Sequence, residues 1–445
     1  MALLHPDTLA AQLFNSRPVR RVGRVAAVER GLLQVTGLSE VAELGQLVSL
    51  PDLDGLSGEV VALAPERLNV LIDGGAEGIG LGARVRHEGP ARLAPSDDWI
   101  GRVVDPSGRP IDGKGPMLMG RDPRPLIGPA PEAAARRGLG PRLSTGLSLF
   151  DTVLPLARGQ RMGLFAGAGV GKSTLLARLA TGLEADLVVV ALIGERGREL
   201  REFCERVLGP KGMSRAIVVA ATADRSPLVR RRCAYAAMAV AEHFRDAGRH
   251  VLLLADSITR FAEAHREIAL VSGEPAALGG YPASVAQRLL SLAERAGPGG
   301  DGVADITAVL TVLVAGGDMD GTVPDVLRGV LDGHVILDRA IAERGRYPAV
   351  DIPRSVSRAL PAAASQDENA LIADLRAVLG SYEQVELMVQ AGLYQAGGDP
   401  AADRAVALWP KIEAFASRTA HQGVGESFSA LAALLAGADT EGASG

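Results

Sequence analysis

Cysteine, lysine and aromatic residues are all scarce in this chain of 445 residues. The only two cysteines, Cys204 and Cys233, stand within apolar helical patterns, and two are too few to build a disulfide framework. The 7 histidines are scattered without the spacing of metal ligands, so the sequence predicts no metal cluster. Aromatic residues make up 3% and the net charge is −5, which argues against a protein whose main task is to coat nucleic acid.

Long apolar runs are missing as well. The longest nearly uncharged run, at 306–317, is shorter than the roughly 20 residues that a membrane-spanning helix needs. The residues from Met1 onward show no charged start followed by an apolar stretch and a small-residue cleavage site, so we expect no export signal. Hydrophobic residues nevertheless make up 47% of the chain, which is enough for a sizeable core. We therefore expect a cytoplasmic globular protein of about two to four domains.

The sequence pattern changes along the chain and predicts five segments. Residues 1–17 space their leucines in an amphipathic pattern, which indicates either a helix that needs a partner or a frayed terminus. Short alternating stretches then predict a small β-barrel or sandwich, and helical periodicity follows Ser365. The predicted domains are a partner-binding segment at 1–17, a β-barrel at 18–95, an α/β core at 96–365, a helical domain at 366–435 and a tail at 436–445.

The α/β core is predicted from apolar runs of strand length that alternate with helical stretches between Gly159 and Leu337. Because these runs are continuous, each strand should be buried on both faces, as in a parallel sheet covered by helices. The stretch 105–145 is rich in proline and glycine and is either an ordered connector or a flexible linker. The predicted strands are 161–167, 187–194, 216–221, 251–256 and 306–314, and the predicted helices include 171–182, 197–208, 226–247 and 282–296.

A glycine-rich loop joins the first of these strands to the first helix. Glycines let backbone N–H groups converge on a triphosphate, and the start of the helix adds unpaired donors and partial positive charge. The lysine supplies charge to the β- and γ-phosphates, and the serine offers a hydroxyl to Mg²⁺. Ala166 stands where the strict motif has glycine, but Lys172 is one of only four lysines among 47 basic residues. The predicted phosphate-binding residues are Gly167, Ala168, Gly169, Val170, Gly171, Lys172, Ser173 and Thr174.

Two further predicted strands end in carboxylates. Asp256 ends the predicted strand 251–256, and an acid at the carboxyl end of a parallel strand beside a phosphate loop suits the water shell of Mg²⁺. An aspartate that caps the next helix would have the same pattern. Glu195 follows the strand 187–194 and is the candidate that orients and polarises a water in line with the γ-phosphate, although 195–199 also fits a solvated helix start.

These segments together resemble the rotary-type ATPases. The resemblance is strongest to the flagellum-specific export ATPases and to their relatives in type III secretion injectisomes, and it extends over about 18–425. It implies a RecA-like P-loop core with an N-terminal β-barrel and a C-terminal helical domain. The segments that carry it are, in order, GQRMGLFAGAGVGKSTLL, ALIGERGRE, VLLLADSITRFAEAHREI, GEPAALGGYPASV, VLDGHVILDRAIAERGRYPAVDI and SVSR.

The resemblance also implies roles for single residues. It makes Glu195 the catalytic carboxylate, with Arg196 beside it near the γ-phosphate, and it makes Asp256 the magnesium-associated acid. Tyr347, in RYPAVD, aligns with the aromatic residue that stacks on adenine. Arg358, in SVSR, aligns with the arginine that a neighbouring subunit contributes across the interface, with a surface ion pair as the alternative.

Glu195 and Arg358 occur in one chain, whereas the rotary synthases divide these two groups between different chains. A chain that supplies both completes its sites only by head-to-tail association with its own copies, and such contacts close into rings. The family's homohexamer is therefore the expected assembly. The chain departs from the export enzymes where those usually carry acids, and a proline precedes SVSR; these positions are Ala315, Gly317, Val326 and Pro353.

The leading functional hypothesis is an ATPase that hydrolyses Mg-ATP to energise delivery of substrates into the channel of the flagellar type III protein export apparatus. An injectisome ATPase shares every motif. A catalytic subunit of a rotary synthase is less favoured, because the C-terminal helices lack an acidic stretch like D-E-L-S-E-E-D. The intact GER at 194–196 disfavours a non-catalytic regulatory subunit, and 18–95 lacks the aromatic and basic face of an RNA-translocating hexamer related to Rho.

The resemblance implies partners as well. They are further copies of the chain, a regulatory stalk- or stator-like protein that binds 1–17, export-gate proteins, export chaperones and export substrates, with no nucleic acid. The family also implies peripheral contact with the inner face of the cytoplasmic membrane.

Overall fold

The computed structural model describes residues 20–29, 31–314 and 319–437, which belong to two compact units. One unit comprises Met1–Pro131 and Leu187–Arg295, and the other comprises Glu132–Asp186 and Ala296–Gly445. Each unit combines two separate stretches of chain, so its core depends on contacts between residues that are distant in sequence. The predicted segment at 1–17 and residues 438–445 of the predicted tail lie outside the described residues.

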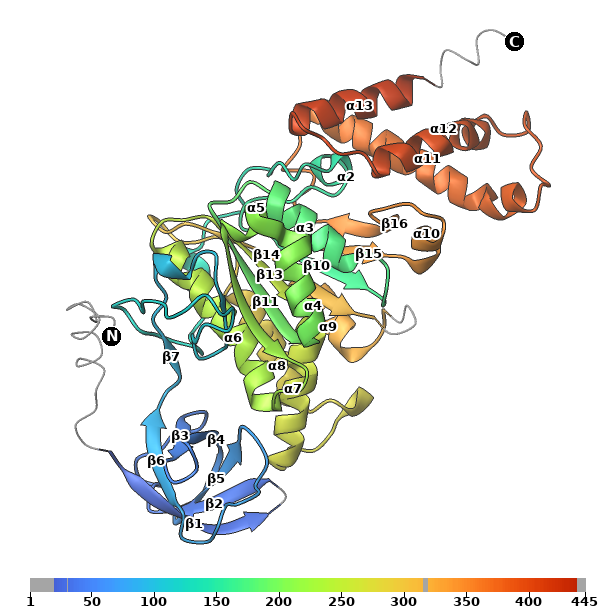
Figure 1. Ribbon diagram of the computed structural model, residues 1–445. Coiled ribbons are helices and arrows are strands. Elements are labelled where there is room, and N and C mark those ends of the chain that lie inside the picture. Colours follow the sequence, from blue (N-terminus) through green and yellow to red (C-terminus); the bar gives the residue numbers. More distant parts are fainter. Residues whose placement is uncertain (1–19, 30, 315–318, 438–445) are drawn as a thin grey trace. The chain divides into compact units, whose positions relative to one another are not determined.

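Six strands of the first unit close into a barrel in the order β1-β2-β5-β4-β3-β6, coloured blue in Figure 1. Along β5, buried and less buried residues alternate, as the two-residue period of a strand requires. Leu33, Val35, Val70 and Val85 are fully buried in the barrel core. The predicted β-barrel is therefore confirmed. The strands are β1 (Val22–Glu29), β2 (Leu32–Thr36), β3 (Leu47–Leu50), β4 (Leu56–Leu63), β5 (Arg67–Ile72) and β6 (Arg84–Gly89).

A segment with little regular structure follows the barrel. Trp99 is fully buried in it, and Arg102 donates two hydrogen bonds to the carboxylate of Asp112 at 2.8 and 2.9 Å. This part of the proline- and glycine-rich stretch is therefore an ordered connector. Its short elements are β7 (Arg92–Leu93), η1 (Asp97–Trp99), β8 (Val103–Val104) and β9 (Arg124–Pro125), with β7 paired to β9.

Parallel strands continue the first unit in the order β13-β11-β12-β8. Every residue of β11 from Leu187 to Gly194 is buried, as the continuous apolar run predicts. Helix α6 packs on β11, β12 and β13, and α7 packs on α6 and β11 (Figure 1). The elements are β11 (Leu187–Glu195), α4 (Gly197–Glu202), η3 (Phe203–Leu208), α5 (Gly209–Met213), β12 (Ala216–Thr222), α6 (Pro227–Asp246), β13 (Val251–Asp256), α7 (Ile258–Val271), η4 (Leu278–Gly280) and α8 (Ala283–Glu294).

The second unit arranges its strands in the order β16-β15-β10-β14. Strand β10 runs parallel to β14 and β15, whereas β16 runs antiparallel to β15. The sequence predicts β10 and β14 but neither β15 nor β16. The elements are η2 (Ala133–Ala135), α2 (Ser148–Asp151), β10 (Arg161–Ala166), α3 (Lys172–Gly182), β14 (Ile306–Leu313), α9 (Thr322–Val330), β15 (Gly333–Leu337), α10 (Arg339–Glu343) and β16 (Val350–Ser357).

Three helices complete the second unit: α11 (Gln366–Gln390), α12 (Pro400–Ala416) and α13 (Val424–Ala436), coloured orange to red in Figure 1. They pack on one another, and α13 also packs on α2. Ser365 and Glu368 form a reciprocal capping box that fixes the start of α11. The predicted fold class, an α/β core with an N-terminal β-barrel and a C-terminal helical region, is confirmed, while the exact domain boundaries stay predictions.

One of the predicted helices is not α-helical over its whole length. The stretch 197–208 begins as α4 and continues as the π-helical turns of η3. The predictions for 226–247 and 282–296 agree with α6 and α8 within two residues at each end. Among the described residues, no helix is both long and apolar enough to cross a membrane.

Candidate functional site

The glycine loop forms the turn between β10 and α3 in the second unit. Gly169 and Gly171 have φ angles of +77° and +87°, in the left-handed region that a residue with a Cβ adopts only at a cost. Ala166, by contrast, is the last residue of β10 and pairs there with Leu313 and Leu337. Because this position has strand geometry, alanine is accepted where the strict motif has glycine.

The helix that follows presents its first turn to solvent on one side. Gly171 occupies the N-cap position and supplies no side-chain cap to the first N–H groups of α3. Ser173 and Thr174 are exposed, whereas Leu175 and Leu176 are buried and anchor the helix. The anchored helix therefore directs its positive end, with Lys172 and Ser173, toward the loop, as an anion site requires.

Tyr347 lies directly against this loop. A Cβ built on Gly171 would come within 3.0 Å of ring atoms Cδ1 and Cε1 of Tyr347, which is tighter than most real Cβ contacts. The tyrosine is 44% exposed, so part of its ring remains open to a ligand. The residue predicted to stack on adenine and the loop predicted to bind phosphates are thus brought together within one unit.

A cavity of about 550 Å³ also opens on the loop. Phe165, Gly167 and Val170 line it, together with Asp338, which follows β15, and Arg354 of β16. Arg354 is also near a half-buried histidine: the Nε2 of His334 donates to the Arg354 carbonyl at 3.0 Å, and burial lowers the pKa of His334. The sequence motifs gave no signal for Asp338 or Arg354, because neither belongs to the glycine loop.

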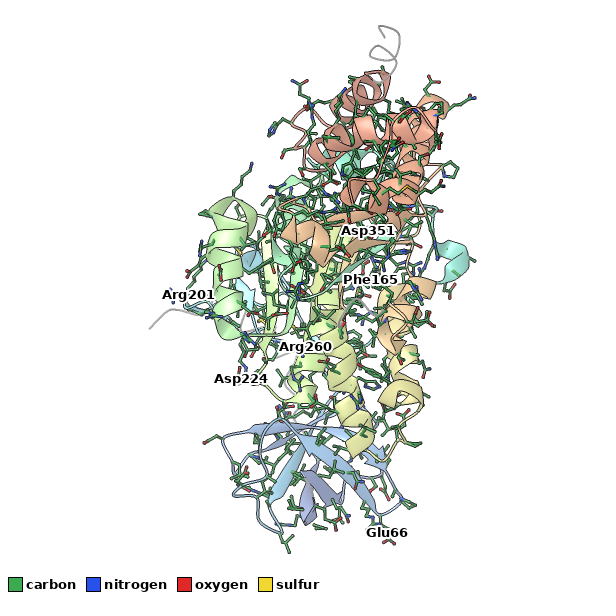
Figure 2. All side chains as sticks on the ribbon, turned by 90° about the vertical axis from the view of Figure 1, so that its right-hand side faces the viewer. Glu66, Phe165, Arg201, Asp224, Arg260 and Asp351 are labelled. Atoms are coloured by element: carbon green, nitrogen blue, oxygen red, sulfur yellow. The ribbon has the colours of Figure 1, made fainter. Side chains whose placement is uncertain are left out.

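Glu195 stands at the carboxyl end of β11 in the first unit, next to an irregularity in the strand. The register with β12 shifts between Ile193 and Glu195, and Gly194 has a φ of +69°. Such bulges re-aim the side chain that follows them. The flank of the bulge is formed by Arg230 and by Arg260 (Figure 2), whose carbon atoms would lie 3.5 Å from a Cβ on Gly194.

Asp256 ends the neighbouring strand β13, where its register partner is Leu192 of β11. The first unit therefore brings Asp256 and Glu195 to the same edge of two adjacent strands. Asp256 is 3% exposed, and the hydroxyl of the next residue, Ser257, is buried with no hydrogen-bond partner among the described residues. A carboxylate beside an unsatisfied hydroxyl offers the oxygen ligands that Mg²⁺ and its bound waters prefer, so these residues fit a magnesium site. Ser257 is not among the site residues predicted from the sequence.

The two predicted arginines lie at exposed positions. Arg196 occupies the N-cap position of α4 and forms an ion pair with Glu199 at 3.6 Å, with 74% of its own side chain exposed. Arg358 follows β16 immediately, is exposed, and donates to the carbonyl of Arg328 at 3.3 Å. In β16, Pro353 is accommodated because this strand is the first of the sheet order and, among the described residues, pairs with β15 alone.

The predicted site residues thus form two groups. Residues 167–174, Tyr347 and Arg358 belong to the second unit, and Glu195, Arg196 and Asp256 belong to the first. Of the positions where the chain departs from the export enzymes, Val326 lies in α9, and Ala315 and Gly317 lie outside the described residues.

Comparison with known proteins gives matches over nearly the whole chain. The model of the ATP synthase alpha/beta family nucleotide-binding domain matches residues 146–357, and that of the T3SS EscN ATPase C-terminal domain matches residues 364–435. The flagellum-specific ATP synthase of Caulobacter vibrioides is 43% identical over 439 residues, covering 96% of this chain and 99% of that protein. The type 3 secretion system ATPase of Pseudomonas syringae pv. tomato is 44% identical over 418 residues, covering 92% of each chain.

Solved structures agree with these relatives. The assembled ATPase EscN from the type III secretion system of enteropathogenic E. coli is 33% identical and aligns over 93% of this chain and 100% of its own, with a TM-score of 0.87. The assembled EscN in complex with its central stalk EscO has the same identity and coverage, with a TM-score of 0.84. The fold, the glycine loop and these matches together show that the chain belongs to the family of flagellum-specific ATP synthases and type 3 secretion system ATPases.

Proposed function

We propose that this protein is the Mg-ATP-hydrolysing motor of a flagellar type III protein export apparatus. The observation that carries the proposal is the glycine loop, whose left-handed Gly171 lies against the ring of Tyr347 at the uncapped start of α3. This arrangement supports a phosphate cradle with an aromatic face for a base beside it. The family membership supplies the reaction, since its members are named as ATP synthases and ATPases.

The second unit binds the nucleotide in this proposal. Backbone N–H groups of the loop and of the first turn of α3 bind the phosphates, and Lys172 contributes its charge to the β- and γ-phosphates. Tyr347 stacks on adenine, for which its exposed ring is available. Ser173 offers its hydroxyl to Mg²⁺, which, when bound, neutralises charge that develops on the phosphate oxygens.

The first unit supplies the acids. Asp256, with the buried hydroxyl of Ser257 beside it, holds the water shell of the metal. Glu195 orients the attacking water and accepts its proton, and the bulge at Gly194 sets the direction of its side chain. Arg196 lies near the γ-phosphate in this assignment.

The active form in this proposal is a ring of identical chains. Arg358 is exposed, as a residue that reaches into a neighbouring subunit must be. Arginines of this kind contribute roughly 10³–10⁵ in rate in related nucleotide hydrolases. The assembled form of EscN and its complex with the central stalk EscO support a homohexamer and a stalk partner here, with the stalk-like protein binding 1–17.

Delivery of export substrates would also involve export-gate proteins, export chaperones and the inner face of the cytoplasmic membrane. The flagellar apparatus is favoured over an injectisome because the Caulobacter vibrioides flagellar relative aligns over more of both chains than the Pseudomonas syringae injectisome relative. The two are distinguished by expressing this gene in a strain from which the flagellar ATPase has been deleted and measuring swimming. A flagellar enzyme should restore motility, whereas an injectisome enzyme would not.

Two variants test the enzymatic part. Lys172→Ala should lose both nucleotide binding and turnover, because it removes the charge at the phosphates. Arg358→Ala should bind ATP normally in equilibrium dialysis but lose at least about 10³-fold in kcat, since its guanidinium acts only in the neighbour's site. Hydrolysis by Arg358→Ala at the wild-type rate would disprove the shared site.

A further inference from the structure

A second cavity of the second unit is lined in part by residues just before Tyr347. It measures about 550 Å³ and is formed by α10, β16, α11 and α12. Among the residues that line it are Arg346, Asp351 (Figure 2) and, from α12, Trp409 and Glu413. Arg346 directly precedes Tyr347 in the chain but is not one of the predicted site residues.

Arg346 is a buried charge with few hydrogen bonds. Only 7% of its side chain is exposed, and Nη2 donates to the carbonyl of Val350 at 2.8 Å. Nε lies 3.2 Å from Oε1 of Glu413, a close ion pair without hydrogen-bond alignment, and Nε and Nη1 have no hydrogen-bond acceptor among the described residues. Burial lowers the pKa of Arg346, and Glu413 is the strongest influence in the opposite direction. Glu413 is therefore the main compensation for a charge that is costly to bury.

Glu413 belongs to helix α12, which packs on α11. Trp409, one turn earlier on α12, stacks on Tyr382 of α11 with ring centroids 3.8 Å apart and planes 4° from parallel. Arg404, further back on α12, donates two hydrogen bonds to Asp374 of α11 at 2.7 and 2.8 Å. The backbone of Glu413 thus belongs to a pair of helices that these contacts join.

Tyr347 has little freedom between its two neighbours. Its ring packs on Gly171, and the residues on either side of it, Arg346 and Pro348, are buried. A shift of Arg346 would therefore be passed directly to Tyr347 and to its contact with the phosphate loop. We propose that Arg346 and Glu413 are positioning residues that hold Tyr347 over Gly171, so that helix α12 contributes to binding of the base. This inference rests on the proposed role of Tyr347 in stacking on adenine.

The experiment compares a ligand that has a base with one that lacks it. Dissociation constants for Mg-ATP and for Mg-tripolyphosphate are measured by isothermal titration calorimetry on the full-length protein. Tyr347→Ala sets the scale: it should weaken ATP binding about 5- to 150-fold, the range for loss of one stacked base, and leave tripolyphosphate binding unchanged. Glu413→Gln should weaken ATP binding about 3- to 10-fold, near the lower end of the effect of Tyr347→Ala, and likewise leave tripolyphosphate binding unchanged. The conservative variant Glu413→Asp keeps the negative charge and should therefore retain part of the ATP affinity that Glu413→Gln loses.

The matched control is Glu386→Gln. Glu386, on α11, pairs at 3.5 Å with Arg344, which lies only two residues before Arg346 in the chain. The side chains of Glu386 and Arg344 are 33% and 45% exposed, respectively. Because exposed pairs contribute little, this variant should change ATP affinity less than about twofold. The circular dichroism spectra and melting temperatures of all variants establish that they are folded.

The possible outcomes separate this inference from the proposed function. Equal weakening of ATP and tripolyphosphate binding by Glu413→Gln would mean general damage to the site, and no weakening of either would mean no coupling; both overturn the inference. If Tyr347→Ala leaves ATP affinity unchanged, the stacking role and this inference fall together. The nucleotide site itself fails only if Lys172→Ala retains tripolyphosphate binding.

Discussion

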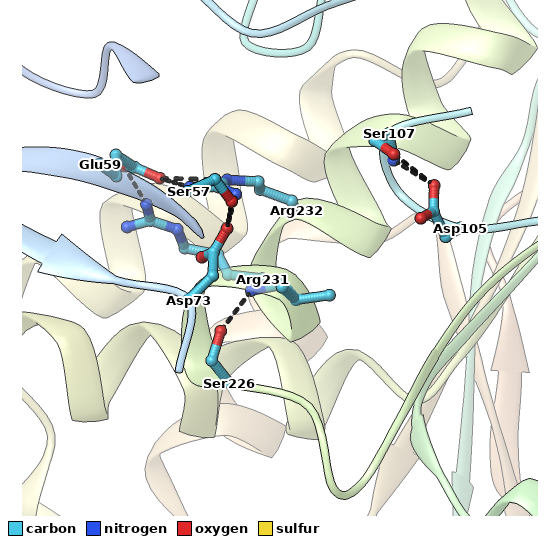
Figure 3. A network of polar contacts seen from close by, with 9 residues as sticks. Ser57, Glu59, Asp73, Asp105, Ser107, Ser226, Arg231 and Arg232 are labelled. Carbon is cyan, nitrogen blue, oxygen red and sulfur yellow. Dashed lines mark hydrogen bonds and ion pairs between the residues drawn. The ribbon is translucent and has the colours of Figure 1, made fainter. Parts of the chain in front are cut away.

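Four buried charges connect the β-barrel to helix α6 and allow a quantitative prediction (Figure 3). Glu59 of β4 forms ion pairs with Arg231 and with Arg232, the latter at 3.2 Å, and Arg232 also pairs with Asp73 at 2.8 Å. All four side chains are between 7% and 12% exposed. Replacement of Glu59 by glutamine keeps the shape of the side chain and removes the negative charge between two guanidinium groups.

The cost of this change follows from what each arginine retains. Arg232 keeps Asp73, but Arg231 loses the one carboxylate with which it pairs among the described residues. An uncompensated buried charge costs about 3–5 kcal/mol. At about 2 °C for each kcal/mol, the value for units of roughly 250 residues, the melting transition of the first unit should fall by about 6–10 °C. Since the pair is shielded from solvent, 1 M NaCl should change this difference little.

Differential scanning calorimetry of Glu59→Gln and of an exposed control measures the effect. The control is Glu205→Gln, because Glu205 pairs at 2.9 Å with Arg201, which projects from α4 (Figure 2), and these side chains are 60% and 78% exposed. This control should shift the transition by less than about 2 °C. Replacement of both Glu59 and Arg231 by methionine should recover much of the loss, because no unpaired charge remains. A melting temperature of Glu59→Gln within 2 °C of the control would show that Arg231 is not left as a costly unpaired charge.

Three further predictions concern the site and pH. Gly171→Ala should weaken Mg-ATP binding at least about tenfold by calorimetry, because φ is +87° and the new Cβ would approach the ring of Tyr347 to 3.0 Å; unchanged affinity would contradict this geometry. Asp256→Asn should raise the Mg²⁺ concentration for half-maximal turnover while nucleotide binding without metal persists, and an unchanged Mg²⁺ requirement would remove Asp256 from the metal site. Burial lowers the pKa of His265 from 6.5 to about 4, so the unfolded chain binds more protons between these values and the free energy of unfolding should fall as pH drops from 6.5 to 4. In urea titrations His265→Gln should flatten this decline, and an identical slope would contradict it.

The buried strands could be predicted from the sequence because their signal is local. Strands β11 and β13 are continuous apolar runs, and the observed bounds differ from the predicted ones by one residue at most. The glycine loop is equally local, since eight consecutive residues form it. The strand β16 could not be found in this way, because it lies at an edge and alternates polar with apolar residues around Pro353. Strand β8 has only two residues and gains its place by pairing with β12.

The contacts that position the site had no local signal. The register shift that re-aims Glu195 depends on β12, more than twenty residues later in the chain. The resemblance to a known family found Tyr347, but it did not show that the ring lies on Gly171. Ser257 is an ordinary serine at the start of a helix, and its unsatisfied hydroxyl becomes evident only when its surroundings are known.

The preference of this chain for arginine over lysine has a structural reason at its buried pairs. Arg295 is 1% exposed and uses three nitrogens, two toward Glu242 at 2.8 and 2.7 Å and one toward the carbonyl of Leu126 at 2.6 Å. A lysine presents one compact ammonium group and could not reach these acceptors in the same fork geometry. Arg231 and Arg232 share Glu59 in a related way, so replacement by lysine at such positions would keep the charge but lose the geometry. Lys172 is different, because a triphosphate site requires a point charge at the end of a flexible stem. Arginine at the buried pairs and lysine in the loop therefore follow from the same chemistry.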